Sequence, residues 1–176
     1  VSTSLLWAAS TILSAETLKD IDPLSANVLK TLFAAVSMLP IAFVMGEIQD
    51  VSRLSLYGLL FVILAVIIGF GIGDTLLFKS IGLTGVSRSY TIAYTYPLFT
   101  MIFATFFLAE PFLPKYLLGT LVIFFGIITA LANENSKDAR KTSKGFLWAF
   151  AAAISWSIAT VLVALGLKDI NVISAN

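Results

Sequence analysis

The sequence contains no cysteine and no histidine among its 176 residues. The absence of cysteine excludes disulfides and thiolate chemistry, and without either residue the usual zinc-ligand sets are excluded. Histidine is also the side chain that most often transfers protons near neutral pH. These absences argue against the thiol, zinc and histidine-dependent classes of enzyme, and we expect no catalytic residue, metal or cofactor.

Charge is also scarce. Charged residues make up 12% of the chain and the net charge is +1, whereas an average soluble domain is about a quarter charged. Hydrophobic residues make up 59%, and the mean hydropathy is +0.98. Uncharged runs of about 18 or more residues are long enough to cross a bilayer. The sequence therefore predicts an all-α, polytopic transmembrane helical bundle, and its small net charge argues against a nucleic-acid partner.

Short polar segments divide the apolar chain into predicted membrane spans. We expect the third helix to continue through the amphipathic segment 75–86 and to turn at Gly82 and Gly85. Asp22 followed by Pro23 favours a break before the second span. The six predicted spans cover residues 1–15, 28–45, 56–72, 87–110, 116–132 and 145–167.

The span at 87–110 contains the first candidate binding site. A helix over its twenty-one central uncharged residues rises about 30 Å, the thickness of the hydrocarbon core. Pro97 lies near the middle, where proline removes one backbone hydrogen bond and frees the carbonyl of Ala93 four residues earlier. Tyr90 and Tyr94 share a face with Pro97. The freed carbonyl and the two hydroxyls could bind a solute; alternatively, proline only bends the helix and the tyrosines anchor it at the interface.

An internal repeat is the strongest long-range pattern. Residues 18–27 read LKDIDPLSAN and residues 167–176 read LKDINVISAN. Since one repeat contains five spans, an odd number, consecutive copies must be inverted relative to each other in the membrane. Extended upstream without a gap, the same register pairs identical residues at four further positions: Trp7 with Trp156, Thr11 with Thr160, Leu13 with Leu162 and Ala15 with Ala164.

The repeat also predicts the organisation of the chain. Residues 1–133 form a first five-helix repeat whose start is truncated, residues 134–144 form a polar linker, and residues 145–176 begin a second repeat. We expect the intact protein to have about ten spans, of which this chain supplies six. The alternative is a complete six-helix protein.

Further candidates follow from polar and aromatic residues inside the spans. Trp156 lies near the middle of its span, and tryptophan at that depth needs a partner for its N–H or a ligand to stack on. Its repeat equivalent Trp7 lies near Ser10, and Ser14 follows one helical turn later. These four residues are candidate substrate-binding residues. The alternative is that all four only pack helices together, a role common for small hydroxyl residues.

Asp74 is the most polar candidate. An ionisable residue inside a membrane is a functional hypothesis by default, and Asp74 could face an amine or carry a coupling proton. The alternative is that Asp74 and Lys79 form a pair at the membrane boundary that sets the end of a helix, with Lys79 extending toward the headgroups.

Several short motifs occur in a definite order along the chain. In that order and spacing they resemble the EamA-type transporters of the drug/metabolite transporter superfamily, in which arginine is more usual at the position of Lys30. The resemblance covers essentially the whole chain. Its motifs are Asp22-Pro23-Leu24, Lys30, Pro40, GDTLLFKSIGLTGVSRS at 73–89, Pro97, Glu110, Gly119 and Gly126.

The resemblance implies ten helices in two inverted five-helix repeats around a central cavity that opens alternately to either side. It implies a secondary-active transporter, exporter or importer, of small metabolites such as amino acids or related amphipathic solutes, in the cell membrane. The expected partners are a small-molecule solute, the lipid bilayer, the remaining half of the same transporter and, as an open option, a second copy forming a homo-oligomer.

Other functions stay open at this point. A promiscuous multidrug exporter coupled to protons needs a buried carboxylate, for which only Asp74 is a candidate. An integral-membrane enzyme needs acid, base or metal ligands that converge at one depth, and the sequence shows no such cluster. A sensory membrane domain gives no reason for an inverted repeat or a central proline.

Overall fold

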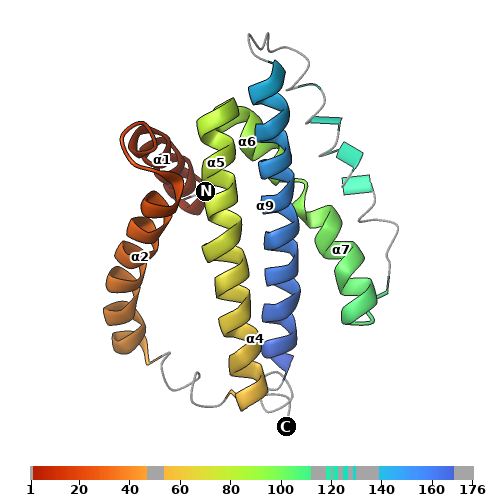
Figure 1. The fold of residues 1–176 in the computed structure, drawn as a ribbon. Helices are drawn as coiled ribbons and strands as arrows, with labels where there is room; N and C mark the ends of the chain where they lie inside the picture. The colour runs from red at the N-terminus through yellow and green to blue at the C-terminus, as the bar shows by residue number, and fades with distance from the viewer. Residues whose placement is uncertain are drawn as a thin grey trace.

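The computed structural model describes residues 2–46, 54–111, 118–119, 121–122, 125–126, 129 and 139–168. All elements in these residues are helices, which confirms the predicted all-α class (Figure 1). In order they are α1 (Ser2–Thr17), α2 (Pro23–Met45), α4 (Leu56–Val66), the π-helix η1 (Ile67–Gly73), α5 (Asp74–Thr84), α6 (Val86–Ala93), α7 (Tyr96–Phe107) and α9 (Ala139–Gly166).

The third predicted helix does continue beyond residue 72. The elements α4, η1 and α5 follow one another without a break over Leu56–Thr84, 29 residues. The helix ends at Gly85, whose φ of +81° is the left-handed region that favours glycine. Gly82, by contrast, lies inside α5, so the predicted turn there is wrong. The π-helix was not predicted, and such wide turns often occur at functional sites.

The helix α9 lies antiparallel along this long helix (Figure 1). Small residues allow the close approach, as in many membrane-helix pairs. A Cβ added to Gly58 would lie 2.7 Å from the carbonyl oxygen of Gly166, and one added to Gly69 would lie 2.8 Å from the Cβ of Ala159. The two helices therefore form the rigid centre of the described structure.

The helix α2 has a well-defined start. Asp22 Oδ1 accepts hydrogen bonds from the backbone N–H groups of Leu24 (3.0 Å) and Ser25 (3.1 Å), and Pro23 is the first helical residue. Aspartate at the N-cap and proline in the first turn are both favoured there. The helix begins at Pro23, as the Asp22-Pro23 pattern indicates, five residues before the predicted membrane span at 28–45. The pKa of Asp22 lies below its usual value because of hydrogen bonds to its carboxylate, mainly from the Ser25 side chain and next from the Ser25 backbone N–H.

The span predicted at 87–110 is not one helix. The chain breaks at Tyr94 and Thr95, between α6 and α7, and Pro97 is the second residue of α7. The prediction of a continuous helix bent at Pro97 is therefore wrong. In the first turn of a helix the missing N–H of proline costs no hydrogen bond, because those N–H groups have no partner within the helix.

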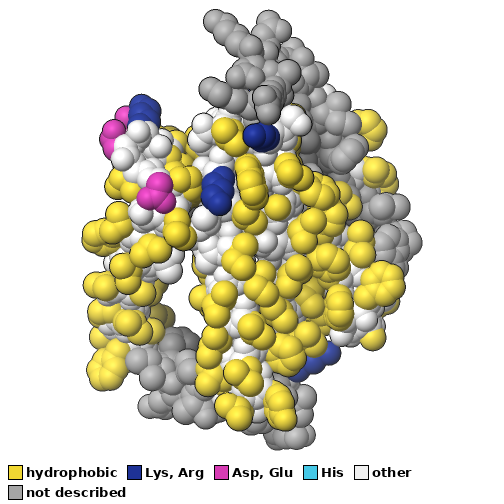
Figure 2. Space-filling view, viewed as in Figure 1, with side chains coloured by type: hydrophobic (Ala, Val, Ile, Leu, Met, Phe, Trp, Pro, Cys, Tyr) yellow, Lys and Arg dark blue, Asp and Glu magenta, His cyan; other side chains and the backbone are white. Residues whose placement is uncertain are grey.

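Most large apolar side chains of the described residues are exposed, whereas the buried residues are mainly small or polar. Figure 2 shows apolar side chains over the flanks of the helices, with most of the visible charged ones toward the upper end and a hollow beside the left-hand helix. The buried polar residues are Asn27, Asp74, Thr75, Ser80, Ser89, Ser155 and Ser157. This distribution is typical of a protein whose surroundings are lipid.

Three helices of the described part are long and apolar enough to cross a membrane: Pro23–Met45, Leu56–Thr84 and Ser143–Gly166. Of the other three predicted spans, the first corresponds to the 16-residue α1, the fourth is divided into α6 and α7, and the fifth lies largely outside the described residues. The sixth begins at Ala139, so the end of the predicted linker is helical.

Candidate functional site

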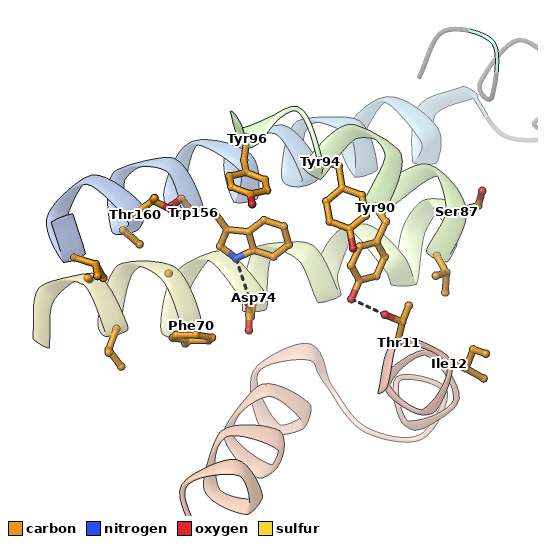
Figure 3. Close-up of a pocket in the computed structure, with 16 residues that line it drawn as sticks. Thr11, Ile12, Phe70, Asp74, Ser87, Tyr90, Tyr94, Tyr96, Trp156 and Thr160 are labelled. Carbon is orange, nitrogen blue, oxygen red and sulfur yellow. Dashed lines mark hydrogen bonds between the residues drawn. The ribbon is translucent and has the colours of Figure 1, made fainter. Parts of the chain in front are cut away.

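An open cavity of about 950 Å³ lies between α1, the long helix, α6 and α9 (Figure 3). Its lining comes from sixteen residues and is mostly apolar, with aromatic rings on the α6–α7 side and one acidic group on the opposite wall. The polar and aromatic members are Thr11, Phe70, Asp74, Ser87, Tyr90, Tyr94, Tyr96, Trp156 and Thr160.

Asp74 lies deep in the bundle. It is 6% exposed and follows the π-helix, eighteen residues after the start of the long helix at Leu56 and ten before its end at Thr84. Its Oδ1 accepts a hydrogen bond of 2.8 Å from Trp156 Nε1, and its Oδ2 forms a salt bridge with Lys30 of α2. A buried carboxylate needs such partners.

The prediction that Asp74 and Lys79 form a boundary pair is wrong, because Asp74 pairs with Lys30. The ammonium of Lys79 instead lies 5.2 Å from the ring centroid of Trp148, within the range of a cation–π contact. The sequence alone does not reveal this pairing, because Lys30 lies forty-four residues before Asp74, on α2.

The three tyrosines of the cavity come from α6, the break and α7. Tyr90 accepts a hydrogen bond of 3.1 Å from Thr11 Oγ1, and its ring centroid lies 5.5 Å from that of Tyr94. Tyr96 meets Trp156 edge to face, at 5.9 Å between centroids. Because these rings face the cavity (Figure 3), they offer a solute both stacking surfaces and hydroxyl groups.

Four of the remaining predicted site residues lie outside the cavity lining. Ala93 has no exposed surface, because it packs in the core cluster with Leu77 and Phe78. Pro97 and Ser14 are half-buried and Ser10 is exposed, and none of the three borders the cavity. The side chain of Trp7 lies outside the described residues.

Thr11, Thr160 and Asn27 were not among the predicted site residues. Thr11 and Thr160 are repeat equivalents and both line the cavity, so their identity in the two copies was an available signal. Asn27 belongs to the SAN tripeptide shared by both copies. It is 3% exposed and attaches α2 to η1, through contacts from Nδ2 to the carbonyl oxygens of Phe70 and Gly71.

The hydrogen bond from Trp156 to Asp74 gives a first testable prediction. Trp156→Phe keeps an aromatic ring but removes the N–H donor. The free energy of unfolding should fall by about 1–2 kcal/mol, a value between those typical of hydrogen bonds to charged groups and of hydrogen bonds between membrane helices. Urea unfolding of the protein in mild detergent measures this change. The control is Trp148→Phe, whose ring remains able to contact Lys79. Equal stability of the two variants would contradict the role assigned to the Trp156 N–H.

The side chains of the site are suited to binding a small molecule. It combines one paired carboxylate with five aromatic residues in a mostly apolar space: Phe70, Tyr90, Tyr94, Tyr96 and Trp156. Among the described residues no three histidine, cysteine or acidic side chains come together as metal ligands. Such a cavity suits an amphipathic small molecule with an apolar body and a polar end.

Comparison with known proteins agrees with these features. Residues 1–132 match the EamA-like transporter family. The chain is 26% identical over 161 residues to an uncharacterized transporter of Archaeoglobus fulgidus, covering 90% of this chain and 55% of that protein. It is 24% identical over 176 residues to the uncharacterized transporter YoaV of Bacillus subtilis, covering 100% of this chain and 59% of that protein.

The chain thus spans a little over half the length of these two relatives. No solved structure matches it significantly. The family match covers three quarters of the chain, and it agrees with the apolar helices and with the arrangement of lipid-facing and buried residues. The chain is an integral membrane protein and belongs to the EamA-like transporter family.

Proposed function

We propose that this protein is a secondary-active transporter, in the cell membrane, of small amphipathic metabolites such as amino acids or related solutes. The observation that carries the proposal is the cavity, about 950 Å³ in volume, in which Asp74 faces a group of aromatic side chains inside membrane-type helices. A solute with an amine end and an apolar body would place its amine at the carboxylate and its body against the rings.

The proposed mechanism is alternating access between two inverted repeats. By the sequence register, α9 starts the second repeat, and the first repeat supplies the cavity-wall residues of α1, the long helix, α6 and α7. The break between α6 and α7 lies at the cavity, at Tyr94, and discontinuous helices are common at transporter binding sites. Since the sequence has no phosphate-binding loop of the ATPase type, the driving force in this proposal is an ion or solute gradient.

Transport by the full-length protein in liposomes tests the proposal. Vesicles that contain the protein should take up some labelled amino acids or amphipathic amines faster than empty vesicles. No transport and no binding of any solute from a broad panel would contradict the carrier function.

The role of the aromatic wall gives a second prediction. Tyr94→Ala removes a ring that lines the cavity, from a residue that is 46% exposed, and should weaken solute binding about tenfold, which corresponds to about 1.4 kcal/mol. Tyr94→Phe keeps the ring and should lose less. Tyr57→Ala is the matched control, because Tyr57 is 76% exposed and lies outside the cavity lining. Similar losses in Tyr94→Ala and Tyr57→Ala would remove Tyr94 from the site.

A second candidate is a multidrug exporter coupled to protons. The burial of Asp74 in the cavity wall favours it, because a carboxylate there could exchange a proton for a cationic drug. Transport of several unrelated organic cations, driven by an imposed pH gradient and lost in Asp74→Asn, distinguishes this candidate from a selective metabolite carrier.

A further inference from the structure

The wide turn of η1 changes the hydrogen bonding of the backbone just before Asp74. The backbone N–H of Asp74 donates to the carbonyl oxygen of Gly69, five residues earlier. In an α-helix the same N–H would donate to Phe70, four residues earlier. The Phe70 carbonyl instead accepts a hydrogen bond of 2.6 Å from Nδ2 of Asn27, which also lies 3.0 Å from the Gly71 carbonyl oxygen. The side chain of Asn27 on α2 thus replaces the α-helical hydrogen bond to Phe70.

The amide of Asn27 is buried as a hydrogen-bond donor. The residue is 3% exposed, and its Oδ1 is buried with no hydrogen-bond partner among the described residues. Carbonyl oxygens only accept hydrogen bonds, so the amide nitrogen must face Phe70 and Gly71. A buried oxygen without a partner costs free energy, and an apolar side chain of similar size would pack α2 without that cost. The amide therefore supplies what an apolar side chain cannot, a donor for η1.

The sequence of η1 explains why the turn needs such a partner. Three of its seven residues are glycine, and glycine inside a helix costs about 1 kcal/mol relative to alanine. Two of them cannot be replaced without a clash with α9, because a Cβ on Gly69 would lie 2.8 Å from the Cβ of Ala159 and one on Gly73 would lie 2.8 Å from Cδ1 of Trp156. A π-turn is also a rare conformation inside an α-helix. We therefore expect η1 to close into an α-helix when contacts from α2 are lost.

We propose that Asn27 is a positioning residue, which sets the direction of the Asp74 carboxylate by holding η1 open. One residue inserted in a π-turn rotates the helix that follows by about 100° relative to a continuous α-helix. Asp74 is the first residue after η1, so its carboxylate would turn away from Trp156 and from the cavity if η1 closed (Figure 3). Lys30, three residues after Asn27, pairs with the same carboxylate. The inference rests on the proposed function, since it names the residue that orients the carboxylate proposed to bind the solute.

The indole N–H of Trp156 reports the direction of Asp74 without any solute, because it donates to Asp74 Oδ1 at 2.8 Å. NMR of the full-length protein in detergent, with isotope-labelled tryptophan, observes this N–H, and Trp156→Phe assigns its signal. In Asn27→Leu the signal should move to the position that it has in Asp74→Ala. Thr31→Leu is the matched control, because Thr31 lies one turn after Asn27 on α2 and is exposed, and it should leave the signal unchanged.

Deletion of Gly71 separates the positioning of Asp74 from the attachment of α2. The deletion removes the inserted residue, so an α-helix can continue through η1 with Asp74 in its present direction. Asn27→Leu combined with this deletion should therefore return the Trp156 signal to its original position. If Asn27 only attached α2 to the long helix, the deletion would restore nothing, because the attachment would still be missing.

Binding of labelled phenethylamine, an amine with an apolar body, measures the effect on the site. It should weaken by at least about tenfold in Asn27→Leu, because a hydrogen bond to a charged group is lost, and it should recover when Gly71 is also deleted. An unchanged Trp156 signal or unchanged phenethylamine binding in Asn27→Leu would overturn the positioning role, as would a signal that does not return on deletion of Gly71.

Folding of the variants keeps the test decisive. If Asn27→Leu does not fold, the deletion of Gly71 should restore folding, and a double variant that also fails to fold would overturn the proposal. A full-length protein that binds no solute would contradict the proposed function, whereas the indole signals decide the role of Asn27 without solute. The two failures are therefore distinguishable.

Discussion

Lys30→Met is expected to lower the free energy of unfolding by about 3 kcal/mol. The Asp74 side chain is 9% exposed, so the variant leaves a carboxylate buried without its cation, and removing one partner of a buried pair typically costs about 3–5 kcal/mol. The lower value applies because the Lys30 side chain is 32% exposed and water screens part of the interaction. Unfolding of each variant in mild detergent, followed by circular dichroism, measures the change.

The double variant Lys30→Met with Asp74→Asn makes the test specific. Asparagine keeps an acceptor for the Trp156 N–H but carries no charge, so the double variant should recover most of the stability that Lys30→Met loses. A double variant no more stable than Lys30→Met would contradict a buried ion pair. As the control, Lys19→Met breaks the exposed pair with Glu16, whose side chains are 66% and 71% exposed, and should cost less than about 1 kcal/mol.

The same double variant separates stability from function. If Asp74 binds the solute amine as proposed, the double variant should be stable and yet fail to transport. Recovery of both stability and transport would show that the ion pair only holds α2 against α5. Site residues inside a membrane protein often carry both roles, and a double-mutant cycle divides them.

The helices were predictable where the signal was local. Uncharged runs indicate α2 and the long helix directly, and Asp22-Pro23 marks the start of α2 because capping depends only on neighbouring residues. The repeat register was equally accessible, and its identical threonines, Thr11 and Thr160, both prove to line the cavity. Tyr90 and Tyr94 were found because aromatic residues beside a helix interruption are an identifiable pattern.

Features that depend on two helices were not predictable from one sequence. The π-helix is accompanied by contacts from Asn27, forty-three and forty-four residues away, and no local propensity encodes such a contact. The salt bridge of Asp74 with Lys30 likewise joins two helices, α5 and α2. Pro97 was predicted at a bend inside one helix, whereas in the structure it lies in the first turn of α7. The sequence pattern is compatible with both positions.

The contact between the long helix and α9 gives the last prediction. Gly58→Val should lower the free energy of unfolding by about 3 kcal/mol, at the upper end of the usual cost of overpacking. Its Cβ would lie 2.7 Å from the Gly166 carbonyl oxygen. A backbone atom of a helix cannot relieve this clash by a side-chain rotation. The helices would have to separate, which weakens every contact along their length.

Gly82→Val is the matched control, because it lies on the same continuous helix and a Cβ there would meet no atom within 4 Å. Valine favours the helix over glycine by a few tenths of a kcal/mol, so this variant should be neutral or slightly stabilising. Opposite signs for the same substitution would show that the small residues at the interface serve the approach of the two helices. Equal effects would mean that the two helices do not pack at Gly58, and the cavity wall formed by α4 and α9 would then lack its rigid support.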